Sequence, residues 1–440
     1  MKISYVTSCG LVCAALILAG CDDGRQAPRK VGVRVANVAP GFEQLEFRRE
    51  QDTRNGATLS FKDSQEFVYD ADTYDFFISE RTLNDTAART WTFAPQLDGA
   101  FSYTFVLTEV GGEIQPVVIE HSEPPATDAQ VAAVHAASGL PALDLYLERP
   151  GVGIAGATPR GSFNAQEQIA PRLPSGDYEL TLTAAGDPAN VFLTTTTITL
   201  PAGTESTFVV VPEGGQGSAQ ISVLLLQGLP SILYDRNAIA ELRYVNGATD
   251  QAPRDVAIDS QFSPPLFSAI PFGEETPYAP YPTAAAKINV TPVGNSGALE
   301  LDQTLAGVPG QRATMLFAGP AGTLTSAFSV DDGRRLNLEA KLRFMSAVSQ
   351  FFAVDFVITF PGEDPNVLFP VASLAAPGIS SSYVPLAPGE YDLYLRQAGT
   401  VTLLSGPTRF TVAAGGLYGV LAVDGPDTAT AGVRFLGDFP

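Results

Sequence analysis

The chain has only two histidines, His121 and His135, so acid–base chemistry by an imidazole has few places to occur. His135 ends the apolar segment VAAVH, and a serine hydrolase would need it as the general base. The equivalent positions of three related segments hold Asn37, Asn246 and Ser346. These side chains can form a hydrogen bond at a strand end, but they cannot act as a general base. We therefore expect His135 to be structural and His121 to be solvent-exposed, and we predict no catalytic residue and no enzyme activity.

A carboxylate also recurs, one per related segment, in the strand that follows: Glu46, Asp144, Asp255 and Asp355. An acid on the outward face of a strand is unfavourable for packing unless it is solvated or paired. We expect a structural acid, either bonded to a neighbouring loop or protecting the sheet edge. Calcium ligation is the alternative, although the sequence has no EF-hand loop. We predict no metal site and no cofactor, because the sequence has no His/Cys set with metal-ligand spacing and no phosphate-binding glycine loop.

Aromatic residues that could stack on a sugar are the remaining candidates for binding. Tyr278 and Tyr281 lie in the segment TPYAPYP, and Phe351 and Phe352 precede an apolar strand. A proline-rich loop and a buried strand start explain the same residues without a ligand. Tyr278 and Tyr281 are therefore only a weak indication of glycan contact.

The charge of the chain restricts its partners. The 440 residues include 47 acidic and 26 basic ones, which gives a formal net charge of −21. Such a surface repels nucleic-acid phosphates and anionic lipid headgroups, so we expect no nucleic-acid partner. A membrane attachment would need an anchor.

The first 21 residues have the order of a bacterial lipoprotein signal. Lys2 is followed by an apolar stretch at residues 9–19, which is too short for a membrane-spanning helix. The stretch ends in LAGC, which resembles the lipobox, where the cysteine is lipidated after cleavage. We therefore predict lipidation of Cys21, through which the protein would attach to a membrane.

Cysteine usage agrees with this prediction. Cys9 and Cys13 lie in the segment that would be removed, so Cys21 is the one cysteine expected in the mature chain and no disulfide is expected within it. Asp22 and Asp23 resemble an inner-membrane retention signal of enteric-type bacteria. This slightly favours the periplasmic face of the inner membrane over the outer membrane.

Four segments about 100 residues apart align with one another: VRVANVAP, VAAVHAAS, LRYVNGAT and LRFMSAVS. Each precedes a second strand with one apolar face, such as LDLYLE at residues 143–148, where Leu alternates with Asp, Tyr and Glu. The period suits tandem β-sandwiches rather than a solenoid. We predict an all-β chain of four tandem antiparallel Ig-like/Greek-key β-sandwich domains.

The domain boundaries follow from the closing and opening strands. We expect a signal peptide at 1–20, a tether at 21–30, and sandwiches at 31–121, 131–227, 241–331 and 341–440. The linker at 228–240 carries Ile232, Leu233 and Tyr234, which are apolar enough to pack between domains. Tyr178 and Tyr391 follow a tight turn, and we expect their hydroxyls to face water.

Three segments of the second copy, at residues 134–147, 175–186 and 194–211, together resemble the bacterial domain-of-unknown-function family numbered 4397. The matching residues of the second copy are His135, Asp144, Tyr146, Gly176 and Tyr178. Those of the fourth copy are Asp355, Gly389 and Tyr391, and the first and third copies match in pattern only. The resemblance implies β-sandwich modules in envelope and secreted proteins, and it implies no reaction.

From these features we expect a non-catalytic, lipid-anchored protein of a bacterial cell envelope. It would be a multi-domain structural or interaction scaffold, with its sandwiches arranged as a short rod and an envelope protein or glycan as its partner. The alternative is a protein that binds envelope polysaccharide.

Overall fold

The computed structural model describes residues 29–50, 56–81, 89–123, 126–213, 218–374, 377–427 and 429–437. These residues form β-strands and one short 3-10 helix, η2 (Pro365–Val367), and no α-helix is found among them. The strands build four similar two-sheet units, called sandwiches 1 to 4 in chain order. In each, the sheet that holds the first strand is called the A-sheet, and the facing sheet that holds the second strand is called the B-sheet. The prediction of an all-β chain of tandem sandwiches is confirmed.

Sandwich 1 sets the pattern of strands. Its A-sheet has the order β4-β1-β7-β8 and its B-sheet the order β3-β2-β5-β6. The strands are β1 (Lys30–Asn37), β2 (Gln44–Arg49), β3 (Ala57–Ser60), β4 (Ser64–Asp70), β5 (Phe76–Arg81), β6 (Thr90–Phe93), β7 (Ser102–Val110) and β8 (Glu113–His121). Each A-sheet also contains one parallel pair, here β1 with β7, which the expectation of antiparallel sheets did not include.

Sandwich 2 repeats this order with extra short strands. Its A-sheet strands are β9 (Asp128–His135), β12 (Gln168–Ile169), β13 (Arg172–Pro174), β17 (Glu205–Pro212), β18 (Ile221–Leu226) and β19 (Pro230–Leu233). Its B-sheet strands are β10 (Leu143–Glu148), β11 (Gly161–Phe163), β14 (Gly176–Ala184), β15 (Asp187–Thr194) and β16 (Ile198–Leu200). Strand β19 belongs to the expected linker, which thus extends the A-sheet.

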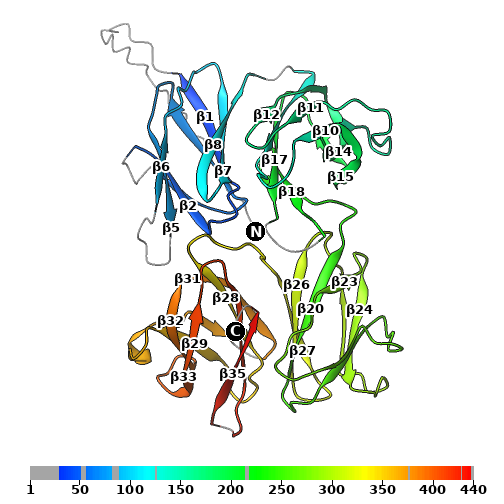
Figure 1. Ribbon diagram of the computed structural model, residues 1–440, viewed down its shortest axis with the longest axis vertical. Helices are drawn as coiled ribbons and strands as arrows, with labels where there is room; N and C mark the ends of the chain where they lie inside the picture. Colours follow the sequence, from blue (N-terminus) through cyan, green and yellow to red (C-terminus); the bar gives the residue numbers. More distant parts are fainter. Residues whose placement is uncertain are drawn as a thin grey trace, which may run out of the picture.

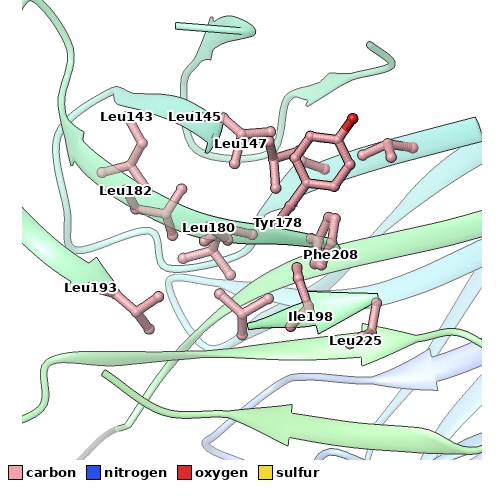
Figure 2. Close-up of a cluster of buried hydrophobic side chains, with 14 of the residues drawn as sticks. Leu143, Leu145, Leu147, Tyr178, Leu180, Leu182, Leu193, Ile198, Phe208 and Leu225 are labelled. Atoms are coloured by element: carbon pink, nitrogen blue, oxygen red, sulfur yellow. The ribbon is translucent and has the colours of Figure 1, made fainter. Parts of the chain in front are cut away.

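Apolar and polar residues alternate in LDLYLE, and the apolar face of β10 lies in the core of sandwich 2. Leu143, Leu145 and Leu147 are fully buried there. Figure 2 shows them in one cluster with Leu180 and Leu182 of β14 and with side chains from the facing sheet. Burial of each such side chain stabilises the fold by roughly 1.5–3 kcal/mol.

Sandwiches 3 and 4 follow the order of sandwich 1. Sandwich 3 has A-sheet strands β23 (Ala279–Tyr281), β20 (Ala240–Ala248), β26 (Arg312–Gly319) and β27 (Thr325–Val330) and B-sheet strands β22 (Phe267–Ile270), β21 (Arg254–Ile258), β24 (Ala286–Pro292) and β25 (Leu301–Leu305). Sandwich 4 has A-sheet strands β31 (Ile379–Leu386), β28 (Ala340–Ser346), β34 (Leu417–Asp424) and β35 (Ala431–Gly437) and B-sheet strands β30 (Ala372–Leu374), β29 (Val354–Thr359), β32 (Gly389–Gln397) and β33 (Leu403–Val412).

The four sandwiches do not form the expected rod. Figure 1 shows them at the corners of a square, with sandwich 1 in blue beside both sandwich 2 and sandwich 4. The outer faces of the A-sheets meet in pairs, because each A-sheet carries apolar side chains on both of its faces. Sandwiches 1 and 2 share one buried cluster: Ala36, Val38, Val106, Ile119, Ala132, Val134, Ala136, Val209, Val211, Leu224 and Leu226. Sandwiches 3 and 4 share another: Val245, Leu316, Ala318, Met345, Ala347, Leu421, Val423 and Leu436.

Candidate functional site

Charged side chains gather where the A-sheets of sandwiches 3 and 4 meet. Arg243 of β20 and Arg343 of β28 both approach Asp331, which directly follows β27. The Arg243 Nε atom lies 3.7 Å from Asp331 Oδ2, and Arg343 forms an ion pair with Oδ1. The side chains of Arg343 and Asp331 are only 3% and 4% exposed, so each depends on the other for its solvation. Arg243 has a second partner, because its Nη1 donates to Glu275 Oε2 at 2.6 Å.

Two tyrosines complete this cluster. The Tyr278 hydroxyl donates to Asp331 Oδ2 at 2.5 Å, and the Arg312 guanidinium lies 4.5 Å from the centre of its ring. The Arg343 guanidinium lies 4.2 Å from the centre of the Tyr383 ring. Burial, and then the nearby Asp331 charge, raise the pKa of Tyr278, and burial raises the pKa of Tyr383 to about 12. Both phenols therefore stay protonated at neutral pH.

A second charged group continues from the first along the linker to sandwich 4. Asp332 Oδ2 pairs with Lys341 Nζ at 2.8 Å and with Arg334 Nη2 at 2.6 Å. Burial acts to raise the pKa of Asp332, but the hydrogen bonds and charges of Arg334 and Lys341 outweigh it and hold this pKa at about 2. Burial lowers the pKa of Lys341 to about 8, against the raising effect of Asp332.

Arg334 connects this group to sandwich 1. Its Nη1 donates to the main-chain oxygen of Phe42 at 3.2 Å, and its Nη2 donates to Glu43 Oε2 at 3.1 Å. Its guanidinium also lies 4.4 Å from the centre of the Phe61 ring. The linker between sandwiches 3 and 4 is therefore bonded to a loop and a turn of sandwich 1.

Asn337 makes the same connection three residues later. Its main-chain nitrogen donates to the oxygen of Gly41 at 2.9 Å, and its Nδ2 donates to Glu109 Oε1 at 2.9 Å. A Cβ atom on Gly41 would lie 2.3 Å from Asn337 Nδ2, so a larger residue there would displace the Asn337 side chain from this contact. The contacts from Asp331 to Asn337 are together called the central junction.

A cavity of about 410 Å³ opens beside the central junction. Its lining includes Glu43, Asp332, Arg343, the serines of β31 and Tyr383. The Ser380 and Ser381 hydroxyls donate to the main-chain oxygens of the residues that follow them, at 3.3 and 2.6 Å. The lining thus offers hydrogen bonds and charge, and its described residues include no histidine that could activate a serine.

The polar residues at the ends of the first strands share one hydrogen bond. Each accepts the main-chain N–H two residues ahead: Asn37 at 3.0 Å, His135 through Nδ1 at 3.3 Å, Asn246 at 3.0 Å and Ser346 at 3.4 Å. His135 is fully buried, and its Nε2 donates to the main-chain oxygen of Pro141 at 3.0 Å. Burial lowers the pKa of His135, so the ring is neutral and both nitrogens are occupied at neutral pH.

His121 is not solvent-exposed as expected. It is 3% exposed, because sandwich 2 covers the end of β8, and its Nε2 lies 3.0 Å from Thr104 Oγ1. Burial lowers its pKa, which the Glu205 charge raises and the Arg34 charge lowers further.

The recurring acids lie on the outer faces of the B-sheets and accept hydrogen bonds from turns. Asp144 Oδ2 accepts from Gly186 N at 2.8 Å, Asp255 Oδ2 from Gly294 N at 2.9 Å, and Asp355 Oδ2 from Gly399 N at 3.3 Å. Each glycine has a positive φ in the hairpin that follows the third B-sheet strand. The other oxygen of each acid accepts from Ser162, Ala269 N or Ser373. Glu46 instead pairs with Arg81 at 3.4 Å.

The tyrosines considered for glycan contact do not present open ring faces. Tyr281 is 5% exposed, and its one hydroxyl proton lies between the main-chain oxygens of Leu305 and Ala286, at 2.9 and 3.1 Å from the hydroxyl oxygen. Tyr278 lies within the charged cluster described above, with the Arg243 guanidinium also 5.0 Å from its ring centre. This placement does not suit stacking on a sugar.

Tyr178 and Tyr391 also differ from the expectation that their hydroxyls face water. Their rings are 3% and 5% exposed. The hydroxyls donate to the main-chain oxygens four residues earlier, Pro174 at 2.7 Å and Ala387 at 2.8 Å. Each therefore fixes the turn before its own strand.

In the part of the chain that the structure describes, no three His, Cys, Asp or Glu side chains come close enough to hold a metal ion. No described helix has the length and apolar character to cross a membrane. Cys21 lies outside the described residues, so its lipidation stays a prediction.

The sequence analysis missed the charged cluster, although a signal was present. The second residue of the aligned first strands is Arg34, Arg243 and Arg343 in three copies and Ala132 in the other. A cation repeated on the outward face of an otherwise apolar strand indicates a paired, covered position. Its partner Asp331 lies at the end of another strand, and the pattern alone does not reveal that the two meet.

Residues 240–357 match the model of the family described as "Domain of unknown function (DUF4397)". The match covers sandwich 3, the linker and the start of sandwich 4, and it bears out the resemblance to this family. It does not include the second copy, which supplied most of the matching residues in the sequence.

No curated protein sequence matches the chain. Among solved structures, "The Bacillus anthracis TIE protein" is similar at 10% identity and a TM-score of 0.16, over 89% of this chain and 67% of that chain. "Central Fibronectin-III array of RIM-binding protein" is similar at 8% identity and a TM-score of 0.11, over 70% and 95%.

Proposed function

We propose that the protein is a lipid-anchored component of a bacterial cell envelope whose four sandwiches act together as a non-catalytic interaction scaffold. The observation that carries this proposal is the central junction. Through Arg334 and Asn337, the linker before sandwich 4 bonds to sandwich 1, so that contacts between the sandwiches form a closed circuit.

Such a circuit suits a scaffold better than a string of independent domains. Domains joined only by small polar contacts are expected to move relative to one another. Here two apolar clusters and the central junction oppose such motion. A partner would therefore meet surfaces from several sandwiches at fixed separations, and the net charge of −21 favours a partner with a basic surface.

The anchor is proposed from the LAGC motif that ends at Cys21. Acyl chains on this cysteine would hold the body at a membrane, since each buried methylene contributes about 0.8 kcal/mol. Asp22 favours the periplasmic face of the inner membrane over the outer membrane.

Membrane fractionation tests the anchor. We expect the Cys21→Ala variant to leave the membrane fraction and the matched Cys13→Ala variant to remain in it. A Cys21→Ala variant that stays with the membrane would remove the basis for the anchor.

Affinity capture and small-angle scattering test the scaffold. Arg334→Ala removes charged hydrogen bonds that contribute about 1.5–3 kcal/mol each. We expect this variant to have a larger radius of gyration and to retain less of a protein partner captured by the intact chain. The proposal fails if capture is unchanged while the radius increases. Saturable binding to an envelope glycan, with no captured protein, favours the polysaccharide-binding alternative.

A further inference from the structure

An apolar cavity of about 420 Å³ opens at the edge of sandwich 4. It lies where β29 ends, beside the end of β31 and the start of β32. Its lining is Leu338, Glu339, Ile358, Thr359, Phe360, Glu363, Leu368, Val371, Leu386, Ala387 and Tyr391. Its volume is within the range of small-molecule sites, and such sites are mostly apolar with a few polar groups.

The cavity reaches the core because β30 is short. Strand β30 pairs with β29 only from Val354 to Phe356, so it leaves the end of β29 uncovered. Ile358 there packs against the buried core of sandwich 4. At the rim, Leu338, Leu368 and Phe360 are 40%, 37% and 58% exposed. A ligand could therefore enter from solvent and contact the core.

Neither hydroxyl among the described residues of the lining is available to a ligand. Thr359 is only 2% exposed and its Oγ1 atom is buried, so a molecule in the cavity does not reach it. The Tyr391 hydroxyl is already bonded to the main-chain oxygen of Ala387. The walls therefore offer a ligand apolar contact rather than a hydrogen bond.

Sandwich 2 carries charged residues at the positions equivalent to those around the cavity. The strand pairing makes Glu148 equivalent to Thr359 and Arg160 equivalent to Val371. Arg160 Nη2 and Glu148 Oε1 form an ion pair at 2.9 Å.

The next residue of sandwich 2 also differs. Arg149 occupies the place of Phe360, and its guanidinium lies 4.3 Å from the ring centre of Tyr178, the counterpart of Tyr391. In sandwich 4, Phe360 stacks on Tyr391 instead, at 5.4 Å. Three charged residues of one copy are thus replaced by Thr, Phe and Val at the opening of the other.

We propose that this cavity binds an uncharged amphiphile with a single aliphatic chain. The aliphatic walls would take the chain, and the uncharged head would lie at the solvent-exposed rim. Glu363 in the lining, on a chain of net charge −21, disfavours a carboxylate head. The ligand class is therefore an alkyl alcohol or ester rather than a fatty acid anion.

Displacement of the neutral dye N-phenyl-1-naphthylamine by decanol and by decanoate tests this proposal. The full chain carrying Cys21→Ala is used, because it needs no detergent. We expect saturable dye binding, displacement by decanol, and at least tenfold weaker displacement by decanoate at pH 7. Equal displacement by the two compounds, or no saturable dye binding, would overturn the proposal.

Substitutions in the lining test whether the dye binds in this cavity. Thr359→Glu together with Val371→Arg recreates the ion pair of sandwich 2, and we expect it to lower dye affinity more than tenfold. Phe369→Arg is the matched control, because Phe369 is 94% exposed and does not line the cavity.

Leu368→Trp narrows the rim of the cavity without placing a side chain in the core. It replaces the double variant as the test of the binding site if the double variant does not fold. Unchanged binding in both the double variant and Leu368→Trp would place the site elsewhere and refute the proposal.

Discussion

The contact between sandwiches 1 and 2 and the contact between sandwiches 3 and 4 use equivalent faces of equivalent sheets. In the first pair the face is largely apolar along its length, with Val134 of β9 and Leu224 of β18 at its buried centre. In the second pair an apolar half, which includes Val245 and Met345, continues into the charged cluster around Asp331. The same packing of two A-sheets is therefore stabilised by apolar burial in the first pair and by apolar burial together with ion pairs in the second.

The difference begins with one position of the first strand. In the second pair, Arg243 and Arg343 face each other across the contact and share Asp331. In the first pair, Arg34 pairs with Glu66 on the adjacent strand β4, and the position opposite is Ala132. Apolar contact supplies stability without direction, whereas buried ion pairs fix orientation at a cost in desolvation. The two pairs should therefore respond differently to loss of charge, loss of volume and pH.

Loss of Asp331 is expected to have the largest effect. Asp331→Ala leaves the Arg343 charge buried without its partner, which costs about 3–5 kcal/mol. Urea unfolding, followed by probes in sandwiches 3 and 4, measures this loss. Asp302→Ala is the control, because Asp302 pairs with Lys287 at the exposed surface and should cost at most about 1 kcal/mol. Equal effects of the two substitutions would show that the cluster is not critical to the contact.

Loss of volume tests the first pair. Leu224→Ala removes a side chain that is 1% exposed, and the cavity left behind should cost about 2–5 kcal/mol. Because no charge is removed, the loss should not depend on salt, unlike that of Asp331→Ala. Leu229→Ala, at a position that is 89% exposed, should be close to neutral. A neutral Leu224→Ala would show that the apolar cluster does not hold the pair together.

Lowering the pH should destabilise the contact between sandwiches 1 and 2 before the contact between sandwiches 3 and 4. The pKa of His121 is lower in the folded chain, so the unfolded state binds its proton first and stability falls as the pH drops through about 6.5. The pKa of Asp332 is held at about 2, so its contribution is present above about pH 4 and is lost only as the pH falls towards 2.

Hydrogen exchange of peptides from β8 and β27 at pH 7 and pH 5 measures this order. We expect faster exchange at β8 only, and no such change in a His121→Gln variant. His135→Asn, which installs the residue of sandwiches 1 and 3, removes the contribution of the second histidine. Faster opening of β27 at pH 5 would contradict the expected order.

Loss of a single tyrosine hydroxyl should have the smallest effect on stability, and this effect should be the same in a sandwich of the first pair and in one of the second. Tyr178→Phe and Tyr391→Phe each remove one hydroxyl bond to a turn, in sandwich 2 and sandwich 4. Each should cost about 1 kcal/mol in thermal unfolding. Clearly unequal costs would show that the sandwiches themselves, and not only their contacts, differ in stability.

The sequence predicted the sandwiches well because period-two strands carry their own signal. LDLYLE alternates, and Leu143, Leu145 and Leu147 lie in the core as the alternation requires. It predicted the arrangement of the sandwiches poorly. The first four residues of VAAVH are all apolar, which indicates a strand covered on both faces, yet the partner that covers Ala132 and Val134 lies in another sandwich.

The candidate site was harder to predict for a related reason. Asp331 and Arg343 are twelve residues apart in the chain, but they meet only because two A-sheets pack together. His121 was expected in water because it ends a strand, and the neighbouring sandwich buries it. Local patterns report which face of a strand is apolar, and they do not report which distant surface covers it.

The bond between Arg334 and Phe42 joins residues 292 positions apart, and this separation bears on when the bond can form. An unfolded loop of that length would be slow to close, although its entropic cost grows only with the logarithm of its length. If sandwiches 1 to 3 fold first as the chain is synthesised, the residues between Phe42 and Arg334 are already folded, and the two ends are held at a short distance. The bond would then form last, and an export or synthesis defect in sandwich 3 would leave sandwich 1 packed on sandwich 2 but not bonded to the linker before sandwich 4.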